Sequence, residues 1–299
     1  MIDGILNIHK APGMTSHDVV ARIRKLLRQK RVGHTGTLDP MATGVIPICV
    51  GQATRVAEYL SESGKAYRAE ITFGAVTDTY DAEGTIIRTS NTDALTLEHI
   101  ENLLPHFLGP QLQVPPLYSA IKIQGQPAYK HARAGEALTL EPRPIEITQL
   151  SIIDWQHPKL TLNIECTKGT YIRSLAYDLG EALECGAYLT ALIRTRSGPF
   201  TIEQSLTLEQ LTDAIEQEQI ATCLSPADYT LQNYPALHLD EETAQSVLHG
   251  NAFHYELDTA ISQPQHSALA RLYDPNGRFI AIATWNAEHR IWQPKKVLA

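Results

Sequence analysis

The chain has few cysteines and no long apolar run. Four of its 299 residues are cysteines, and no two of them form a CxxC pair. That spacing argues against a structural zinc site or a disulfide framework, so we expect no metal and a reducing, cytoplasmic setting. No run of about 18 apolar residues occurs, and no basic region followed by an apolar stretch stands near the first residue. We therefore expect neither a membrane span nor a secretory signal.

Positive charge is missing from one long part of the chain and concentrated in another. Residues 197–270 contain eleven acidic residues and no Lys or Arg, whereas residues 22–31 (RIRKLLRQKR) contain six cations and no acid. The net charge of −8 counts by itself against a nucleic-acid partner, because phosphate binding depends on Lys and Arg. The uneven distribution indicates either a basic face for a polyanion or simply a solvated helix face, and composition leaves both open.

The hydrophobic periodicity predicts the elements that hold the polar motifs. A helix is expected from Thr15, with Asp18 completing a capping box and Gly33 ending the helix. The strict alternation of KAYRAEITFG, residues 65–74, predicts a strand with Tyr67 on its inward face.

Later segments follow the same logic. TLEHIENLLPHFLG, residues 96–109, predicts an amphipathic helix ended by its last glycine. The alternating segment 159–166 predicts a strand that leads into a helix starting at Thr170, with Arg173 in its first turn. A turn between a strand and a helix is a frequent place for functional residues.

The composition changes near residues 233–235, where short strands with a DPNG turn begin. We therefore predict a first domain at 1–232 and a small β-rich module at 233–299. Within the first domain, a segment at about 110–145 is rich in Pro, Gly, Tyr and cations and is expected to be an extended insertion.

Asp39 stands alone in a glycine-rich loop, GHTGTLDPMATG. A phosphate-binding loop would need GxxxxGK[ST], and no lysine follows these glycines. TGT also occurs at the phosphorylation site of P-type ATPases, but Gly33 and His34 stand where the aspartate and lysine belong. A glycosidase would need a second carboxylate, which is not near in sequence but could come from elsewhere in the fold, and no triad nucleophile sits in a comparable turn. From the residues alone, Asp39 could equally brace the turn before Pro40.

Several segments resemble one family. GHTGTLDPMATGVIPICVG, residues 33–51, closely resembles the central motif of the TruB family of tRNA pseudouridine synthases, GHxGTLDPxATGxLxxxxG. Five more segments resemble the family in order: GILNIHKAPGMTSHDVV, KAYRAEITFGAVTDTYDAEG, QVPPLYSAIKIQGQPAYKHARAG, GTYIRSLAYDLG and YLTALIRTRSGPF. The family's KPxG reads Lys10-Ala11-Pro12-Gly13 here, with the proline one place later.

This resemblance implies an α/β fold with a mixed, mostly antiparallel central sheet flanked by helices, followed by a small PUA-like β domain. It implies the isomerisation of uridine 55 in the T loop of tRNA to pseudouridine, without a cofactor. The uridine would be flipped out of the folded loop before its glycosidic bond is broken and re-formed through C5. The expected partner is the T arm of tRNA, with no required protein partner, and we expect a monomer.

The resemblance also assigns roles to residues at matching positions. Asp39 matches the essential carboxylate, which attacks the anomeric carbon, adds to uracil C6 or helps to deprotonate the sugar, and the sequence leaves these three routes open. Arg173 is the expected cation that holds the pKa of Asp39 down. Tyr67 is expected to pack against the base and assist proton loss from C5, and His34 to fill the space that the base leaves.

Other matching positions are expected to contact RNA. Tyr171 and Leu192 are expected to line the base pocket, and Lys10 belongs to the N-terminal motif. Arg31 lies in the basic segment, and the insertion adds a second basic strip. The cations of that strip are Lys122, Lys130, Arg133 and Arg143.

Two alternatives remain beside the stand-alone enzyme. One is the guide-RNA-dependent relative of archaea and eukaryotes, against which we count the insertion and the lack of long basic tails. The other is a tRNA-binding or folding protein that keeps the scaffold without catalysis, against which we count the intact set of Asp39, Tyr67 and Arg173.

Overall fold

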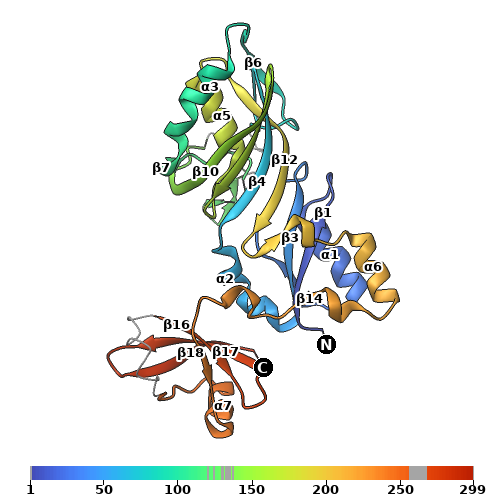
Figure 1. Ribbon diagram of the computed structural model, residues 1–299, viewed down its shortest axis with the longest axis vertical. Helices are drawn as coiled ribbons and strands as arrows, with labels where there is room; N and C mark the ends of the chain where they lie inside the picture. Colours follow the sequence, from blue (N-terminus) through green and yellow to red (C-terminus); the bar gives the residue numbers. More distant parts are fainter. Residues whose placement is uncertain are drawn as a thin grey trace.

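The computed structural model describes residues 2–119, 121–123, 125–128, 131, 136, 138–255 and 268–298. It shows an elongated molecule in which a large sheet occupies one part and a small β domain lies at the far end from α3 and β6 (Figure 1). Among these residues, no helix is both long and apolar enough to cross a membrane.

Ten strands form the central sheet in the order β14-β1-β3-β12-β4-β11-β10-β7, with β2 paired to β3 and β13 to β12. The pairing of β12 with β3 is parallel, and the other pairings in this sheet are antiparallel. The predicted mixed, mostly antiparallel sheet is therefore confirmed. The strands are β1 (Gly4–Lys10), β2 (Val32–His34), β3 (Thr43–Val50), β4 (Lys65–Phe73), β7 (Gly109–Gln113), β10 (Arg143–Gln156), β11 (Lys159–Cys166), β12 (Ala187–Ser197), β13 (Phe200–Thr201) and β14 (Leu224–Ser225).

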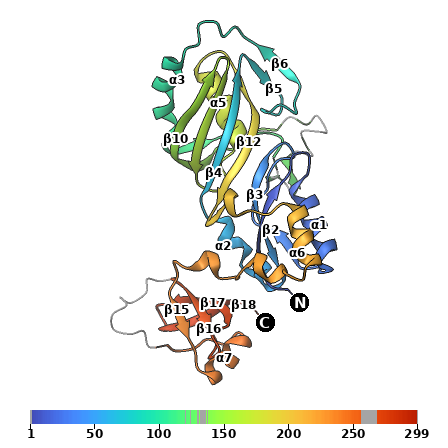
Figure 2. The ribbon, with the colours of Figure 1, turned by 45° about the vertical axis from the view of Figure 1, so that its right-hand side comes forward.

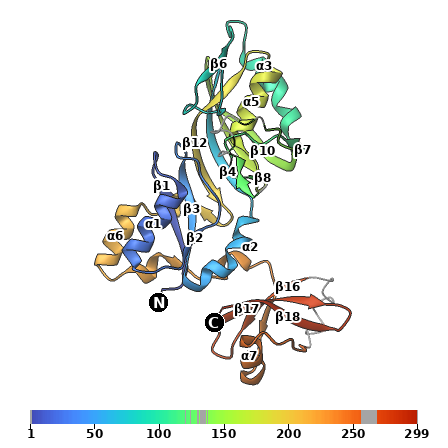
Figure 3. The same cartoon turned by 180° about the vertical axis from the view of Figure 1, so that it is seen from behind.

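Helices cover the sheet at two places. In the two opposite views α1 and α6 lie side by side against the end of the sheet that holds β1, whereas α5 lies with α3 beside β10 (Figures 1 and 3). The helices of this domain are α1 (Ser16–Leu27), α2 (Ala57–Ser61), α3 (Leu97–Leu103), α5 (Ile172–Ala182) and α6 (Leu208–Glu216), with 3₁₀ turns η1 (Gly51–Val56), η2 (Leu104–Phe107), η3 (Ile202–Gln204), η4 (Ile220–Cys223) and η5 (Tyr229–Leu231). Two small hairpins stand outside the central sheet, β5 (Ala75–Thr77) with β6 (Ile86–Thr89), which Figure 2 shows most clearly, and β8 (Lys122–Ile123) with β9 (Gln126–Pro127).

The strand patterns follow from what covers each face. β3 is buried along nearly its whole length because both of its faces are covered, and its sequence is correspondingly a continuous apolar run. Ile46 and Ile48 pack with the core that includes α1, while Val45 and Cys49 pack with Leu60 and its neighbours. In β4 the predicted alternation is confirmed, and Tyr67 is among its buried residues.

The start of α1 was predicted correctly, but its end was not. Thr15 and Asp18 form the capping box. The helix ends at Leu27 because Arg28 takes the left-handed conformation, φ 49°, while its backbone N–H bonds to the carbonyls of the last turn. Gly33 is therefore not the helix stop and lies in β2 instead. A long side chain in the left-handed region gives no sequence signal of the kind that glycine gives.

The helix predicted at residues 96–109 is shorter than expected. The α-helical part ends at Leu103 and continues as the 3₁₀ turn η2, which has Pro105 near its start. Proline has no N–H to donate to the preceding turn, which explains why regular α-helix stops there. Gly109 begins strand β7 rather than ending a helix.

The two ends of the predicted insertion belong to the central sheet. β7 pairs with the start of β10, so that Gln111 lies opposite Ile145 and Gln113 opposite Arg143. The segment between these two strands is 114–142. Within it, Lys122 and Ile123 of β8 pair with Pro127 and Gln126 of β9.

The C-terminal residues form a four-stranded sheet in the order β15-β16-β17-β18. Its elements are β15 (Ala236–His238), α7 (Glu241–Leu248), β16 (Leu269–Tyr273), β17 (Phe279–Asn286) and β18 (Ile291–Val297). The core of this unit centres on the fully buried Trp292. A second apolar cluster joins the two parts of the molecule, because Val56 and Leu231 pack with Ile282 and Leu298.

Candidate active site

Asp39 lies in the loop between β2 and β3, and buried cations donate hydrogen bonds to the backbone of this loop. Lys10 is fully buried, and its ammonium donates to the carbonyls of Pro40 (3.1 Å), Met14 (2.7 Å) and Ala11 (3.0 Å). Arg194 is also buried and donates to the carbonyls of Gly36 and Thr37. The backbone around Asp39 is thus fixed by side chains distant in sequence.

Arg173 and Asp39 form a two-point ion pair. Arg173 Nε lies 3.0 Å from Asp39 Oδ2, and Nη2 donates to Oδ1 at 3.2 Å. Arg173 lies in the first turn of α5 and is buried, while the side chain of Asp39 is 34% exposed. The guanidinium also donates to the carbonyls of Thr79 and Tyr118. One face of the carboxylate is therefore fixed, and the partly exposed side stays open to a substrate.

Asp81 completes the group and was missed in the sequence. It is buried, and its Oδ2 lies 3.3 Å from Arg173 Nη1, so one guanidinium binds two carboxylates. The carboxylate also accepts hydrogen bonds from the hydroxyl of Thr79 and the N–H of Glu83. One signal in the sequence could have identified Asp81, namely an acidic residue in a short loop of a segment that resembles the family.

The charge balance at Asp39 differs from the expectation. Burial raises the pKa of Asp39 above its ordinary value, and the nearby negative charge of Asp81 adds to this rise. Arg173 and Lys10 act in the opposite direction. The prediction that Arg173 lowers the pKa of Asp39 has the right sign, but desolvation outweighs the ion pair, so the net shift of the pKa is upward.

Tyr67 is 7% exposed on β4, directly opposite Arg194 of β12. Burial raises its pKa to about 12, while Arg194 opposes the rise through its charge and a hydrogen bond to the tyrosine. The electrostatic influence of Asp39 also reaches Tyr67. The structure therefore buries the phenol of Tyr67 on the sheet directly opposite the buried Arg194.

Three further predicted residues lie on elements around this group. Tyr171 is the N-cap of α5, two residues before Arg173, and burial raises the pKa of its phenol. Leu192 is buried on β12 opposite Ala69. His34 ends β2, and burial lowers the pKa of its imidazole, which meets the ring of His17 edge to face.

Among the described residues predicted to contact RNA, Lys10 lies beside the Asp39 loop and Arg31 lies away from it. Arg31 is exposed before β2 and donates to Gln52, at the end of β3 away from the Asp39 loop. Lys122 lies in β8, where the backbone alone is described. Lys130 and Arg133 lie outside the described residues. Lys10, as noted, is an internal group and presents no surface to a ligand.

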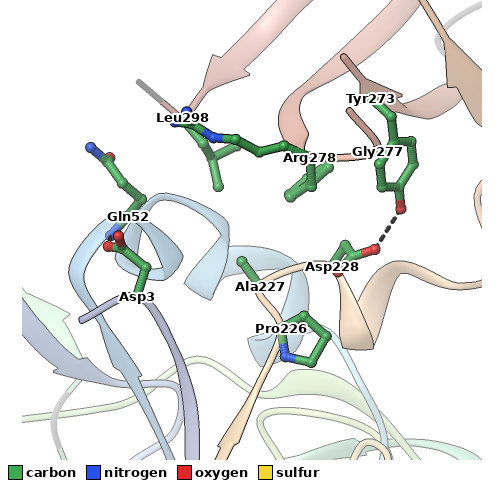
Figure 4. Close-up of a pocket in the computed structure, with 10 residues that line it drawn as sticks. Asp3, Gln52, Pro226, Ala227, Asp228, Tyr273, Gly277, Arg278 and Leu298 are labelled. Atoms are coloured by element: carbon green, nitrogen blue, oxygen red, sulfur yellow. Dashed lines mark hydrogen bonds between the residues drawn. The ribbon is translucent and has the colours of Figure 1, made fainter. Parts of the chain in front are cut away.

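A separate cavity of about 320 Å³ lies where the C-terminal unit meets the first domain (Figure 4). Asp3 and Gln52 line one side, and Arg278 and Leu298 another, while Asp228 and Tyr273 are joined by a hydrogen bond at its edge. The predicted catalytic and RNA-binding residues are not among those that line it.

Family models match consecutive parts of the chain. Residues 24–172 match the TruB family pseudouridylate synthase (N terminal domain). Residues 173–232 match the tRNA pseudouridylate synthase B C-terminal domain, and residues 235–298 match pseudouridine synthase II TruB, C-terminal.

Similar proteins cover nearly the whole chain. The tRNA pseudouridine synthase B of Pseudomonas putida is 42% identical over 300 residues, 99% of this chain and 96% of its own. That of Symbiobacterium thermophilum is 46% identical over 254 residues, 84% of this chain and 83% of its own. Among solved structures, a crystal structure of a Cbf5-Nop10-Gar1 complex matches with a TM-score of 0.74 and 26% identity, covering 99% of this chain and 85% of that one.

The agreement extends over the sheet, the Asp39 loop and the C-terminal unit alike. With 42% identity to a relative over 99% of its length, the chain belongs to the TruB family of pseudouridine synthases.

Proposed function

We propose that this protein isomerises uridine 55 in the T loop of tRNA to pseudouridine, with Asp39 as the essential carboxylate. Relatives that match it over 96% and 83% of their own length bear the name tRNA pseudouridine synthase B. The observation that carries the proposal is the Asp39–Arg173–Asp81 group, whose Asp39 also influences the buried Tyr67 through its charge. If Asp39 only capped a turn, it would not need a buried guanidinium that contacts four groups.

The reaction makes two demands that this group meets. The bond from uracil N1 to the ribose must break, and N1 leaves with the bonding electron pair. After C5 has bonded to the ribose, the C5–H bond must break, its electron pair restores the C5=C6 double bond, and a proton is added at N1. An ionised carboxylate fixed by Arg173 serves the first demand, and Tyr67, as its phenolate, is assigned to remove the C5 proton.

Substrate capture requires that the uridine leave the folded T loop, at a cost of a few kcal/mol in lost stacking. We assign His34 to the space that the base leaves, and Tyr171 and Leu192 to the walls of the base pocket. Lys10 is assigned to positioning the Asp39 loop, because its ammonium is buried against three carbonyls. Arg31, Lys122, Lys130 and Arg133 are assigned to RNA phosphates. The RNA would be recognised chiefly by its shape and by the flipped base.

The unit at 1–232 would carry the chemistry and that at 233–299 would add RNA contacts. We further propose that the protein acts in the cytoplasm as a monomer, without a guide RNA or a protein partner.

The test is tritium release from a T-arm hairpin that carries uridine tritiated at C5, with the purified protein alone. We expect release by the wild type, a loss of roughly 10⁴-fold or more for Asp39→Asn, and no change for Asp154→Asn, a surface carboxylate of β10. Absence of release by the wild type would refute the stand-alone enzyme. Release that survives Asp39→Asn would refute the role of the carboxylate.

A further inference from the structure

Arg194 is a buried cation that the reaction scheme above does not use. It is 1% exposed, and its guanidinium donates to the carbonyls of Val45 at 2.6 Å and Gly36 at 3.1 Å, with a longer contact to Thr37 at 3.4 Å. These carbonyls stand on both sides of Asp39 in the chain. Arg194 therefore fixes the two arms of the loop that presents the carboxylate.

The same guanidinium reaches Tyr67. Arg194 and Tyr67 are directly opposite each other in the antiparallel pair of β12 and β4, so their side chains lie on the same face of the sheet. The guanidinium acts on the tyrosine through its charge and through hydrogen bonding, and both effects lower the pKa of Tyr67. One side chain thus contacts both the carboxylate loop and the phenol.

Gly44 shows how closely β3 and β12 approach at this point. It pairs in parallel with Arg194 and has φ +97°. A Cβ at Gly44 would lie 2.3 Å from the carbonyl oxygen of Arg194, which is far inside van der Waals contact. Glycine is therefore required there for the backbone of Arg194 to come close beneath the Asp39 loop.

The described part of the structure shows no carboxylate in an ion pair with Arg194, although the charge of Asp39 acts on it from the loop. Burying such a cation costs free energy, and burial lowers the pKa of Arg194. A methionine or leucine would fill the space without this cost. A neutral amide could also donate hydrogen bonds to these carbonyls. The positive charge of Arg194 therefore indicates that a neighbouring group becomes anionic.

Resting on the proposed function, we propose that Arg194 is a positioning residue. It holds the hydroxyl of Tyr67 at a fixed position relative to the Asp39 loop, and it stabilises the phenolate that takes the C5 proton. In that step the phenolate oxygen forms an O–H bond, the C5–H bond breaks, and its electrons restore the C5=C6 double bond. The phenol proton has already gone to water.

The other titratable groups around Tyr67 do not supply this stabilisation. Asp39 from the loop and Cys166 from β11 both act to raise the pKa of Tyr67, and Arg194 lowers it. Lys65, on the same strand as Tyr67, is buried near Arg194, and its ammonium contacts the carbonyls of Ser61 and Ser63. Arg194 is thus the cation whose contact with the phenol is supported by both register and hydrogen bonding.

A double-mutant cycle of Arg194→Lys and Tyr67→Phe tests this role. Lysine keeps the charge but cannot serve three carbonyls and a hydroxyl at once. We expect Arg194→Lys to lower the single-turnover rate at saturating hairpin by about 100-fold. It should cost only about tenfold when Tyr67 is already phenylalanine, because the loop contacts are lost in both backgrounds but the contact with the phenol is lost in only one. Hairpin binding should change by less than about threefold in each variant. Arg196→Lys, on the same strand but paired with Glu165 at the surface, is the matched control and should leave the rate unchanged.

An equal loss from Arg194→Lys in both backgrounds would overturn the inference, because it would mean that Arg194 acts on the loop without Tyr67. An unchanged rate in Arg194→Lys would overturn it as well. These results differ from failure of the proposed function, in which the wild-type protein itself would release no tritium.

A measurement on the wild type decides the matter if the variants do not fold or are too slow to measure. It is a crystal structure with a T-arm hairpin that carries 5-fluorouridine, whose C5 has no proton to lose. We expect the hydroxyl of Tyr67 within about 3.5 Å of the Arg194 guanidinium and facing C5 of the base. A Tyr67 hydroxyl that bonds to another group, or an Arg194 turned away from it, would overturn the inference.

Discussion

The surroundings of Asp39 and the interior of the C-terminal unit are built on opposite principles. Around Asp39, buried charged side chains do much of the packing, namely Lys10, Asp81, Arg173 and Arg194. The core of the C-terminal unit consists of apolar side chains around Trp292. Its Arg271 and Tyr273 form a polar network with Asp228 of the first domain, at the edge that faces that domain.

Buried ions and a buried apolar core contribute differently to the free energy of folding. Buried ions rarely add net stability, since desolvation offsets much of their attraction, but removing one partner leaves the other uncompensated. An apolar core stabilises a fold without fixing any reactive group. Substitutions near Asp39 should therefore change the rate most, whereas substitutions in the C-terminal unit should change stability or RNA binding.

The strongest test of this contrast is Arg173→Lys. One ammonium cannot hold both oxygens of Asp39 together with Asp81 and two carbonyls, so the carboxylate loses its fixed orientation. We expect the single-turnover rate to fall roughly 10³-fold while hairpin affinity changes by less than about threefold. Quench-flow assays and filter binding measure these quantities. A rate near that of the wild type would show that the two-point ion pair is not needed.

Asp81→Asn should have a smaller effect and a distinctive pH dependence. We expect a loss of about 30-fold near neutral pH, because Arg173 loses one of its two anionic partners. Because the charge of Asp81 raises the pKa of Asp39, its removal lets Asp39 stay ionised at lower pH. The fall of the rate on acidification should therefore shift to lower pH. Rate profiles on the acidic side of neutrality measure this shift, and a shift to higher pH would contradict the assigned interaction.

The basic segment after α1 tests binding separately from chemistry. Simultaneous change of Arg28, Lys30 and Arg31 to Glu should weaken hairpin binding by about tenfold and flatten its dependence on salt, because fewer counterions are released. At saturating hairpin the single-turnover rate should stay unchanged, since none of these residues contacts Asp39. If affinity keeps its full salt dependence, the basic face is only a solvated surface.

The smallest expected effect concerns the junction with the C-terminal unit. Tyr273→Phe removes a hydroxyl that donates to Asp228 and accepts from Arg271, and should lower the free energy of unfolding by about 1 kcal/mol. Tyr229→Phe, at an exposed ring, is the control and should stay within about 0.5 kcal/mol of the wild type. Urea unfolding measures both. A marked loss of single-turnover rate in Tyr273→Phe would contradict the separation of the two regions.

The sequence was informative wherever a local pattern carries the physical cause. Alternation placed Tyr67 on the buried face of β4, and the capping box placed the start of α1 at Thr15. It was less informative where a single unusual conformation decides. Arg28 ended α1 in the left-handed region, and Pro105 converted the end of α3 into a 3₁₀ turn.

At the candidate site, motif resemblance singled out Asp39, Tyr67 and Arg173, and the fold brought Asp39 and Arg173 into contact across 134 positions of the chain. The resemblance did not single out Asp81. It also did not show that Lys10 is buried against the Asp39 loop, or that Arg194 links this loop to the phenol of Tyr67. The sequence also could not predict the direction of the net pKa shift of Asp39, because desolvation depends on everything that surrounds the carboxylate.

By itself the sequence determined the element types, the family and the residues of the Asp39 loop, because periodicity and motif spacing are properties of neighbours along the chain. Only the tertiary structure decided which cations stand behind Asp39 and which carboxylate shares Arg173. Contacts of that kind join β1, β12 and α5 to a loop far from them in sequence, and their strength depends on burial that no local pattern contains.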